Sequence, residues 1–98
     1  MIWFFCDKMK TIKILLSGTV QGVFFRDFVK ENADTLSVRG FVRNLDDGRL
    51  EIVAEGRDEI VGEFLTKCRE GPNKAHIKNF ETKELKHQGF DSFKILSL

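Results

Sequence analysis

The sequence has almost no excess of one charge, because sixteen lysines and arginines are balanced by fifteen aspartates and glutamates, for a formal net charge of +1. Nucleic-acid-binding domains usually carry a clear basic excess, so we expect no nucleic acid among the partners. A pocket that binds a phosphate group is still compatible with this charge, since one or two cations are enough for it.

Cysteines and long apolar runs are also scarce. Cys6 and Cys68 form no C-x-x-C pair, and Cys68 falls on the apolar stripe of a predicted helix, where a buried reduced thiol is expected. The apolar run at residues 1–6 is shorter than the core of a signal peptide, and no stretch approaches the ~20 apolar residues of a membrane span. We therefore expect a cytoplasmic protein that is not inserted in a membrane.

Clusters of metal ligands are missing from the sequence as well. His76 and His87 lie eleven residues apart with no cysteine or carboxylate at ligand spacing, so surface histidines are expected. Asp46 and Asp47 are adjacent in a turn-like segment and are expected to be solvated. The sequence thus predicts no metal and no cofactor.

The apolar spacing predicts a single domain that alternates between strands and helices. Strands are expected at residues 10–17, 38–44, 49–55, 75–85 and 92–98, and helices at 25–36 and from an N-cap at Asp58 to a stop at Gly71 and Pro72. This order, βαββαβ plus a closing strand, predicts an α+β fold of the ferredoxin-like, split-βαβ type, with an antiparallel sheet and two helices on one face. The domain is expected at residues 9–98, after an N-terminal extension at 1–8; Met9 could equally be the start of translation.

The stretch GTVQGVFFR, Gly18 to Arg26, admits two interpretations. It could be a flexible strand-to-helix connection whose glycines relieve tight turns. It could also cradle an anion, because backbone N–H groups at the start of a helix point outward and the helix dipole adds positive potential there. Arg26 in the first helical turn opposes that dipole, and a bound phosphate would offset the penalty.

Asn44 is expected to lie near this loop. The first two strands flank a helical crossover, so they should be parallel and end at the same rim of the sheet. If the third strand lies between them, the gap is roughly 10 Å, which is two strand spacings of ~4.8 Å. Asparagine is also common at the start of hairpin turns, so Asn44 alone does not indicate a site.

The residues resemble the acylphosphatase family. GTVQGVFFR matches the signature G-x-V-Q-G-V-x-F/Y-R at every specified position. The segment from Gly40 to Gly56 resembles the second signature, with Leu50 where valine is usual. The resemblance extends over Lys10 to Leu96, nearly the whole chain.

This resemblance implies metal-free hydrolysis of acyl phosphates to a carboxylate and inorganic phosphate. We expect a monomer, although no sequence pattern sets the oligomeric state. It implies that Arg26 and Asn44 are catalytic, and that the phosphate-binding loop is Gln21, Gly22, Val23, Phe24, Phe25 and Arg26. Phe24 and Phe25 could also wall the pocket.

Two alternatives belong to other classes of protein. One is a non-catalytic phosphate- or carbamoyl-phosphate-binding domain, like the acylphosphatase-like part of hydrogenase-maturation proteins, although those continue into further domains. The other is an RNA-binding module, because RGFVRNLD begins like an RNP1 strand; it then lacks the stacking aromatic residues.

Overall fold

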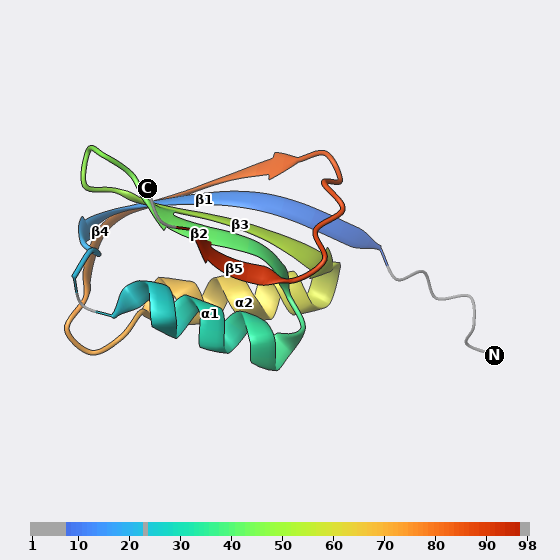
Figure 1. Ribbon diagram of the computed structural model, residues 1–98, viewed down its shortest axis with the longest axis horizontal. Coiled ribbons are helices and arrows are strands. Elements are labelled where there is room, and N and C mark those ends of the chain that lie inside the picture. The colour runs from blue at the N-terminus through green and yellow to red at the C-terminus, as the bar shows by residue number, and fades with distance from the viewer. Residues whose placement is uncertain (1–7, 23, 97–98) are drawn as a thin grey trace.

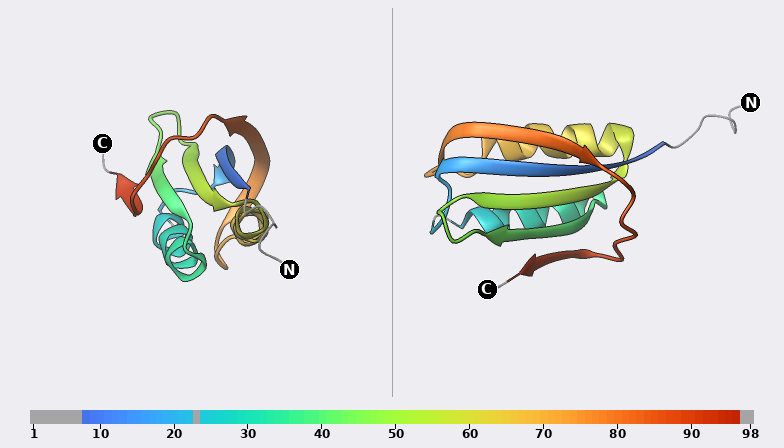
Figure 2. Two further views of the ribbon diagram at one scale, coloured as in Figure 1. Left: turned by 90° about the vertical axis from the view of Figure 1, so that its right-hand side faces the viewer. Right: turned by 90° about the horizontal axis from the view of Figure 1, so that it is seen from above.

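The computed structural model of the protein describes residues 8–22 and 24–96. They form one five-stranded sheet with two helices packed on one face (Figures 1 and 2). In chain order the elements are β1 (Met9–Thr19), α1 (Phe25–Leu36), β2 (Arg39–Asn44), β3 (Leu50–Arg57), α2 (Asp58–Glu70), β4 (His76–Leu85) and β5 (Phe93–Leu96). The predicted ferredoxin-like α+β fold is confirmed. Most of the predicted extension at residues 1–8 lies outside the described residues.

The strand order is β4-β1-β3-β2-β5, and one pairing differs from the prediction of an antiparallel sheet. The first three pairs of neighbours are antiparallel, but β5 runs parallel to β2, so the sheet is mixed. β4 ends at the rim where β2 begins, and residues 86–92 carry the chain along that rim to the other edge (Figure 2). A strand that enters beside β2 from this rim must run in the direction of β2.

The sheet brings the ends of β1 and β2 to the same rim, as the crossover argument predicted. Both strands are antiparallel to β3, which lies between them. Leu50, the first residue of β3, is paired with Leu16 on one side and with Asn44 on the other. Asn44 therefore lies two strands away from the end of β1, next to the loop that follows it.

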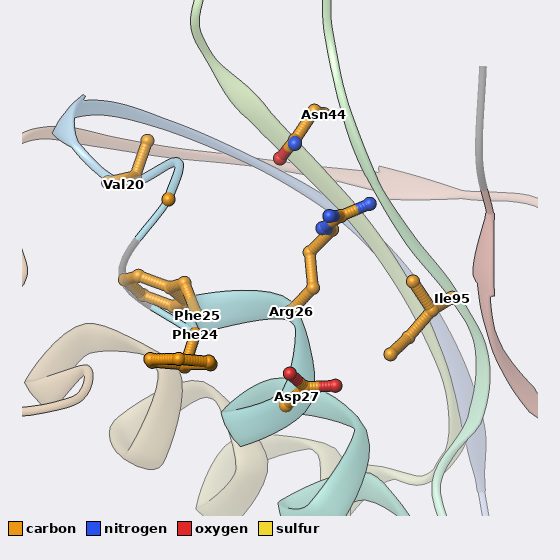
Figure 3. A pocket seen from close by; sticks show the side chains of 8 residues that line it. Val20, Phe24, Phe25, Arg26, Asp27, Asn44 and Ile95 are labelled. Carbon is orange, nitrogen blue, oxygen red and sulfur yellow. The ribbon is translucent and has the colours of Figure 1, made fainter.

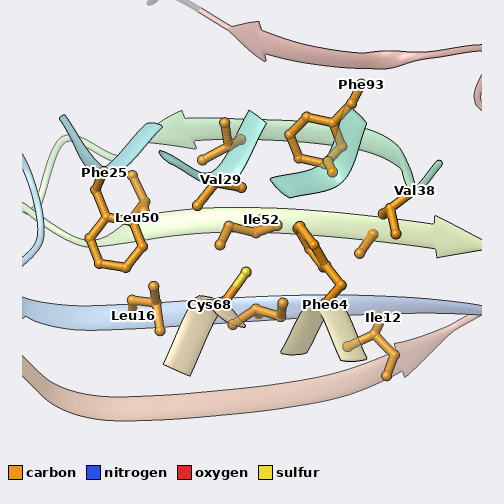
Figure 4. Close-up of a cluster of buried hydrophobic side chains, with 14 of the residues drawn as sticks. Ile12, Leu16, Phe25, Val29, Val38, Leu50, Ile52, Phe64, Cys68 and Phe93 are labelled. Carbon is orange, nitrogen blue, oxygen red and sulfur yellow. The ribbon is translucent and has the colours of Figure 1, made fainter. Parts of the chain in front are cut away.

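The core lies between the sheet and the two helices (Figure 4). Alternate residues of β1 and β3 face the helices because side chains of a strand alternate between its two faces. Cys68 is fully buried in this core with a free thiol, as predicted, and burial raises its pKa. The main contributors are Ile12, Ile14, Leu16, Val29, Ala33, Val42, Leu50, Ile52, Ala54, Val61, Phe64 and Phe93.

The prediction that Asp58 caps α2 is wrong by one position. The helix begins at Asp58 itself, the capping position is occupied by Arg57, and no described side chain makes a capping hydrogen bond there. The carboxylate of Asp58 instead pairs with the Lys10 ammonium at 3.3 Å. No helix in the described part of the chain is long and apolar enough to cross a membrane.

A buried carboxylate on the other face of the sheet holds the connection between β4 and β5. Glu55 of β3 is 1% exposed and accepts hydrogen bonds from Thr11 Oγ1 at 2.5 Å and from the consecutive amides of residues 88–90 at 2.6, 2.9 and 3.0 Å. Burial by itself would raise the pKa of Glu55, but these hydrogen bonds and the imidazole of His87 outweigh it and lower the pKa to about 2. Glu55 is therefore an ionised anchor for the chain that leads into β5.

Candidate active site

A pocket of about 400 Å³ opens at the rim where β1 and β2 end (Figure 3). Its walls come from the β1–α1 loop, the first turn of α1, the end of β2 and the edge strand β5. The lining residues are Val20, Gly22, Phe24, Phe25, Arg26, Asp27, Asn44 and Ile95. The pocket thus joins the two segments that the sequence singled out separately.

The loop enters α1 through left-handed backbone conformations. Gly22 has φ +74°, where glycine has no steric penalty, and a side chain there would meet open space. Phe24 has φ 59° and ψ 25°, which costs a non-glycine residue on the order of 1–2 kcal/mol. No described side chain caps the helix, so its first N–H groups are available at the pocket wall. This is the geometry of an anion-binding helix start.

Arg26 and Asn44 face the pocket from opposite sides (Figure 3). The Arg26 side chain rises from the first turn of α1 toward the end of β2, where the Asn44 side chain points back at it. Within residues 8–22 and 24–96, no carboxylate forms an ion pair with Arg26, whereas Arg43 and Arg49 are paired with Glu51 and Asp47. The Arg26 guanidinium therefore has no described ion-pair partner, although the Asp27 carboxylate also lines the pocket.

The Asn44 side chain carries an unusual buried atom. Its Oδ1 is buried and has no hydrogen-bond partner among the described residues. Buried polar atoms in folded proteins are nearly always paired, so an unpaired acceptor at a pocket wall indicates a place where a ligand or water can donate a hydrogen bond.

Two of the predicted phosphate-loop side chains do not reach the pocket. The Phe25 ring is 1% exposed and belongs to the core, so only its backbone can meet a ligand. The Gln21 side chain donates from Nε2 to the carbonyl oxygens of Leu45 and Arg49, both at 3.0 Å, and so binds the β2–β3 turn. The structure groups Gly22, Phe24, Phe25, Arg26 and Asn44 around one pocket, while Val23 lies outside the described residues.

Three lining residues were missed by the sequence analysis. Asp27 follows Arg26 in the first turn of α1, and this adjacency was a signal that could have been used. Val20 is a fully buried residue that directly follows β1. Ile95 reaches the pocket only because β5 docks beside β2, which no local pattern indicates.

Side chains that could hold a metal ion are not gathered at this pocket. Over the described ranges, no group of three or more His, Cys, Asp or Glu side chains is arranged to hold a metal ion. His76 is exposed, and His87 lies beside Glu55, with Nδ1 at 3.3 Å from its carboxylate. Asp46 and Asp47 are exposed in the β2–β3 turn, as predicted.

Comparison with known proteins identifies the family. The Acylphosphatase family model matches residues 12–95. An acylphosphatase from Rubrobacter xylanophilus is 48% identical over 75 residues, which cover 76% of this chain and 68% of that protein. The crystal structure of an acylphosphatase from Bacillus subtilis superposes with a TM-score of 0.86 at 33% identity, covering 91% of this chain and 99% of the other.

The same domain also occurs within a longer chain. The crystal structure of T. kodakarensis HypF superposes with a TM-score of 0.81 at 40% identity, covering 91% of this chain but only 12% of that one. The family model nevertheless matches most of the present sequence, and both signature segments contribute residues to a single pocket. The protein belongs to the acylphosphatase family, whose members hydrolyse acyl phosphates.

Proposed function

We propose that the rim pocket hydrolyses acyl phosphates without a metal ion, with Arg26 and the loop amides binding the phosphoryl group and Asn44 orienting the attacking water. The observation that carries this proposal is the convergence on one pocket of a guanidinium and a buried amide oxygen that have no ion-pair or hydrogen-bond partner among the described residues. Planar guanidinium groups bind phosphoryl oxygens through two parallel hydrogen bonds, and backbone amides at a helix start supply further donors.

The leaving group explains why so few residues suffice. Water attacks phosphorus, the bond between phosphorus and the acyl oxygen breaks, and the carboxylate leaves with the electron pair. A carboxylate is stable as an anion, so no strong general acid is required to expel it. Positioning and stabilisation of the phosphoryl charge can then supply the catalysis.

Asn44 is assigned to the water because its amide cannot act as a strong base. Its buried Oδ1 can accept one hydrogen bond from the water and so direct the oxygen lone pair toward phosphorus. As the bond from water to phosphorus forms, the water proton passes to an oxygen of the substrate phosphate, so the scheme requires no side chain as a general base. Asn44 thereby contributes orientation and no net proton transfer.

The wider assignments from the sequence are part of the same proposal. Residues 9–98 form the catalytic domain, and we assign the enzyme as a monomer, which gel filtration or light scattering would test. The near-neutral charge supports a small-molecule substrate with no nucleic-acid partner. We place the enzyme in the cytoplasm because of the reduced, buried Cys68 thiol.

A hydrolysis assay with a chelator tests the proposal. Purified protein should release phosphate from benzoyl phosphate and acetyl phosphate in the presence of EDTA, and should leave p-nitrophenyl phosphate nearly untouched. Activity that disappears with EDTA and returns with a divalent ion would refute the metal-free scheme. Phosphate binding without any hydrolysis would instead favour the non-catalytic alternative.

A further inference from the structure

The two walls of the pocket belong to separate segments whose spacing must be fixed. The phosphate-binding wall is formed by Val20, Gly22, Phe24 and the first turn of α1, and the water-binding wall is Asn44 at the end of β2. The strand ladder links them only as far as Leu50, which is paired with Leu16 and with Asn44. Beyond Leu50, the loop and the β2–β3 turn extend past the last hydrogen bonds between β1 and β3.

The Gln21 side chain bridges this unpaired end. Its Nε2 donates to the carbonyl oxygens of Leu45 and Arg49, both at 3.0 Å. Leu45 directly follows Asn44, and Gln21 directly precedes Gly22 of the pocket wall. The bridge therefore joins the two walls one residue away from the groups that face the substrate.

The orientation of this amide is fixed by its partners. Both partners are carbonyl oxygens, so the nitrogen and not the oxygen of the Gln21 amide must face them. Each carbonyl also accepts a backbone hydrogen bond within the turn, from Gly48 to Leu45 at 3.1 Å and from Leu45 to Arg49 at 2.8 Å. The carbonyl oxygens of Leu45 and Arg49 thus accept two hydrogen bonds each, one per lone pair, and both hydrogens of Gln21 Nε2 are donated.

This arrangement leaves the Gln21 side chain no donor for a phosphate oxygen, so its contribution must be of another kind. We propose that Gln21 is a positioning residue, which sets the distance between the phosphate held by the loop and the water held by Asn44. The inference rests on the proposed function. Phosphate binding uses one wall only, whereas hydrolysis requires the two walls in register.

Replacing Gln21 with methionine removes the bridge and keeps the length and approximate volume of the side chain. We expect kcat for benzoyl phosphate to fall by about tenfold or more, because small misplacements of reacting groups reduce rates strongly. The competitive inhibition constant of inorganic phosphate should change by less than about twofold, since the phosphate wall is intact. The matched control is Asn32→Leu, which removes another partly buried amide-to-carbonyl hydrogen bond, to Phe28 at 2.9 Å, and should leave kcat unchanged.

A double-mutant cycle with Asn44→Ala separates positioning from general destabilisation. If Gln21 acts through the placement of Asn44, Gln21→Met should cost little additional kcat when Asn44 is already alanine, so the two effects should not multiply. All rates are measured at least 15 °C below the melting temperature of each variant. Two effects that multiply fully would overturn the inference.

A second variant asks whether hydrogen-bond donation is the property that matters. In Gln21→Glu, a carboxylate faces two carbonyl oxygens without a donor, but the protonated acid can donate one hydrogen bond. The kcat of this variant relative to wild type should therefore rise as the pH is lowered from 8 to 5, while that of Gln21→Met relative to wild type stays constant. A constant ratio for both variants would count against the inference.

Wild-type protein in the same assays keeps the two proposals distinguishable. If wild-type protein hydrolyses benzoyl phosphate but the effects of Gln21→Met and Asn44→Ala on kcat multiply fully, the positioning role is refuted and the proposed function stands. Wild-type protein that binds phosphate but does not hydrolyse benzoyl phosphate removes both.

Discussion

Replacing Glu55 with glutamine should destabilise the protein strongly at neutral pH, because Glu55 is buried and ionised and anchors residues 88–90. Glutamine has nearly the same shape, but it puts an NH₂ group where one carboxylate oxygen accepts hydrogen bonds. The pKa of Glu55 is about 2 in the folded protein and 4.5 ordinarily. This difference corresponds to about 3 kcal/mol of unfolding free energy at pH 7. For a domain of this size the melting temperature should fall by roughly 12–24 °C.

The pH dependence provides a sharper test than the melting temperature alone. Because folding lowers the pKa of Glu55, the stabilising contribution is fully present above about pH 4.5 and is lost as the pH falls toward 2. Glutamine resembles the protonated acid, so the stability difference between wild type and variant should shrink across this window. Urea unfolding at a series of pH values measures it.

A neighbouring glutamate on the same face of β3 supplies the control. Glu51 pairs with Arg43 at 2.6 Å, but the arginine side chain is 41% exposed. Such partly solvated pairs contribute up to about 1 kcal/mol, so Glu51→Gln should have a much smaller effect. The reasoning about Glu55 fails if its variant is no less stable than this control, or if the stability difference stays constant between pH 5 and 2.5.

Substitutions in the pocket and in the sheet should separate binding, turnover and folding. Inorganic phosphate should raise the melting temperature of wild-type protein but not that of Arg26→Ala, and equal responses in the two proteins would contradict the cradle. Folded Asn44→Ala should lose roughly 10²–10³ in kcat with little change in KM, whereas turnover near wild type would make Asn44 a turn residue only. Gly40→Ala should prevent stable folding, because its Cβ would lie 1.8 Å from the Val53 carbonyl oxygen at φ +139°. Gly48→Ala, at φ +93° in open space, should cost much less, as thermal melting of the two variants would reveal.

The rim pocket was predictable from the sequence because it depends on strand order. The helical crossover between β1 and β2 requires those strands to be parallel, and this brings Asn44 to the loop that contains Arg26. The prediction that Asn44 and Arg26 lie at one rim required only the strand directions and no side-chain positions. Periodicity likewise predicted the buried Cys68, because helical spacing determines which face of α2 packs on the sheet.

Features that depend on contacts between distant segments were not predictable in this way. The direction of β5 follows from where β4 ends and from the anchor at Glu55, and neither leaves a local pattern in residues 92–98. Ile95 reaches the pocket only as a consequence of that direction. The bonds of Gln21 to the β2–β3 turn require the actual approach of two loops, which the family signature does not describe.

The strand order also has a consequence for how the chain folds. Among the described strands, only β2 and β3 are joined by a short turn, and the other three pairings connect segments far apart in the sequence. Hairpins form in about 1–10 μs, whereas domains dominated by such non-local pairings fold in roughly milliseconds to seconds. The turn next to Asn44 can therefore form early, long before β1 docks against β3 and brings the Gln21 bridge into place. The ability to hydrolyse acyl phosphates should consequently arise only with the slow docking of β1, because that step brings the two walls of the pocket together.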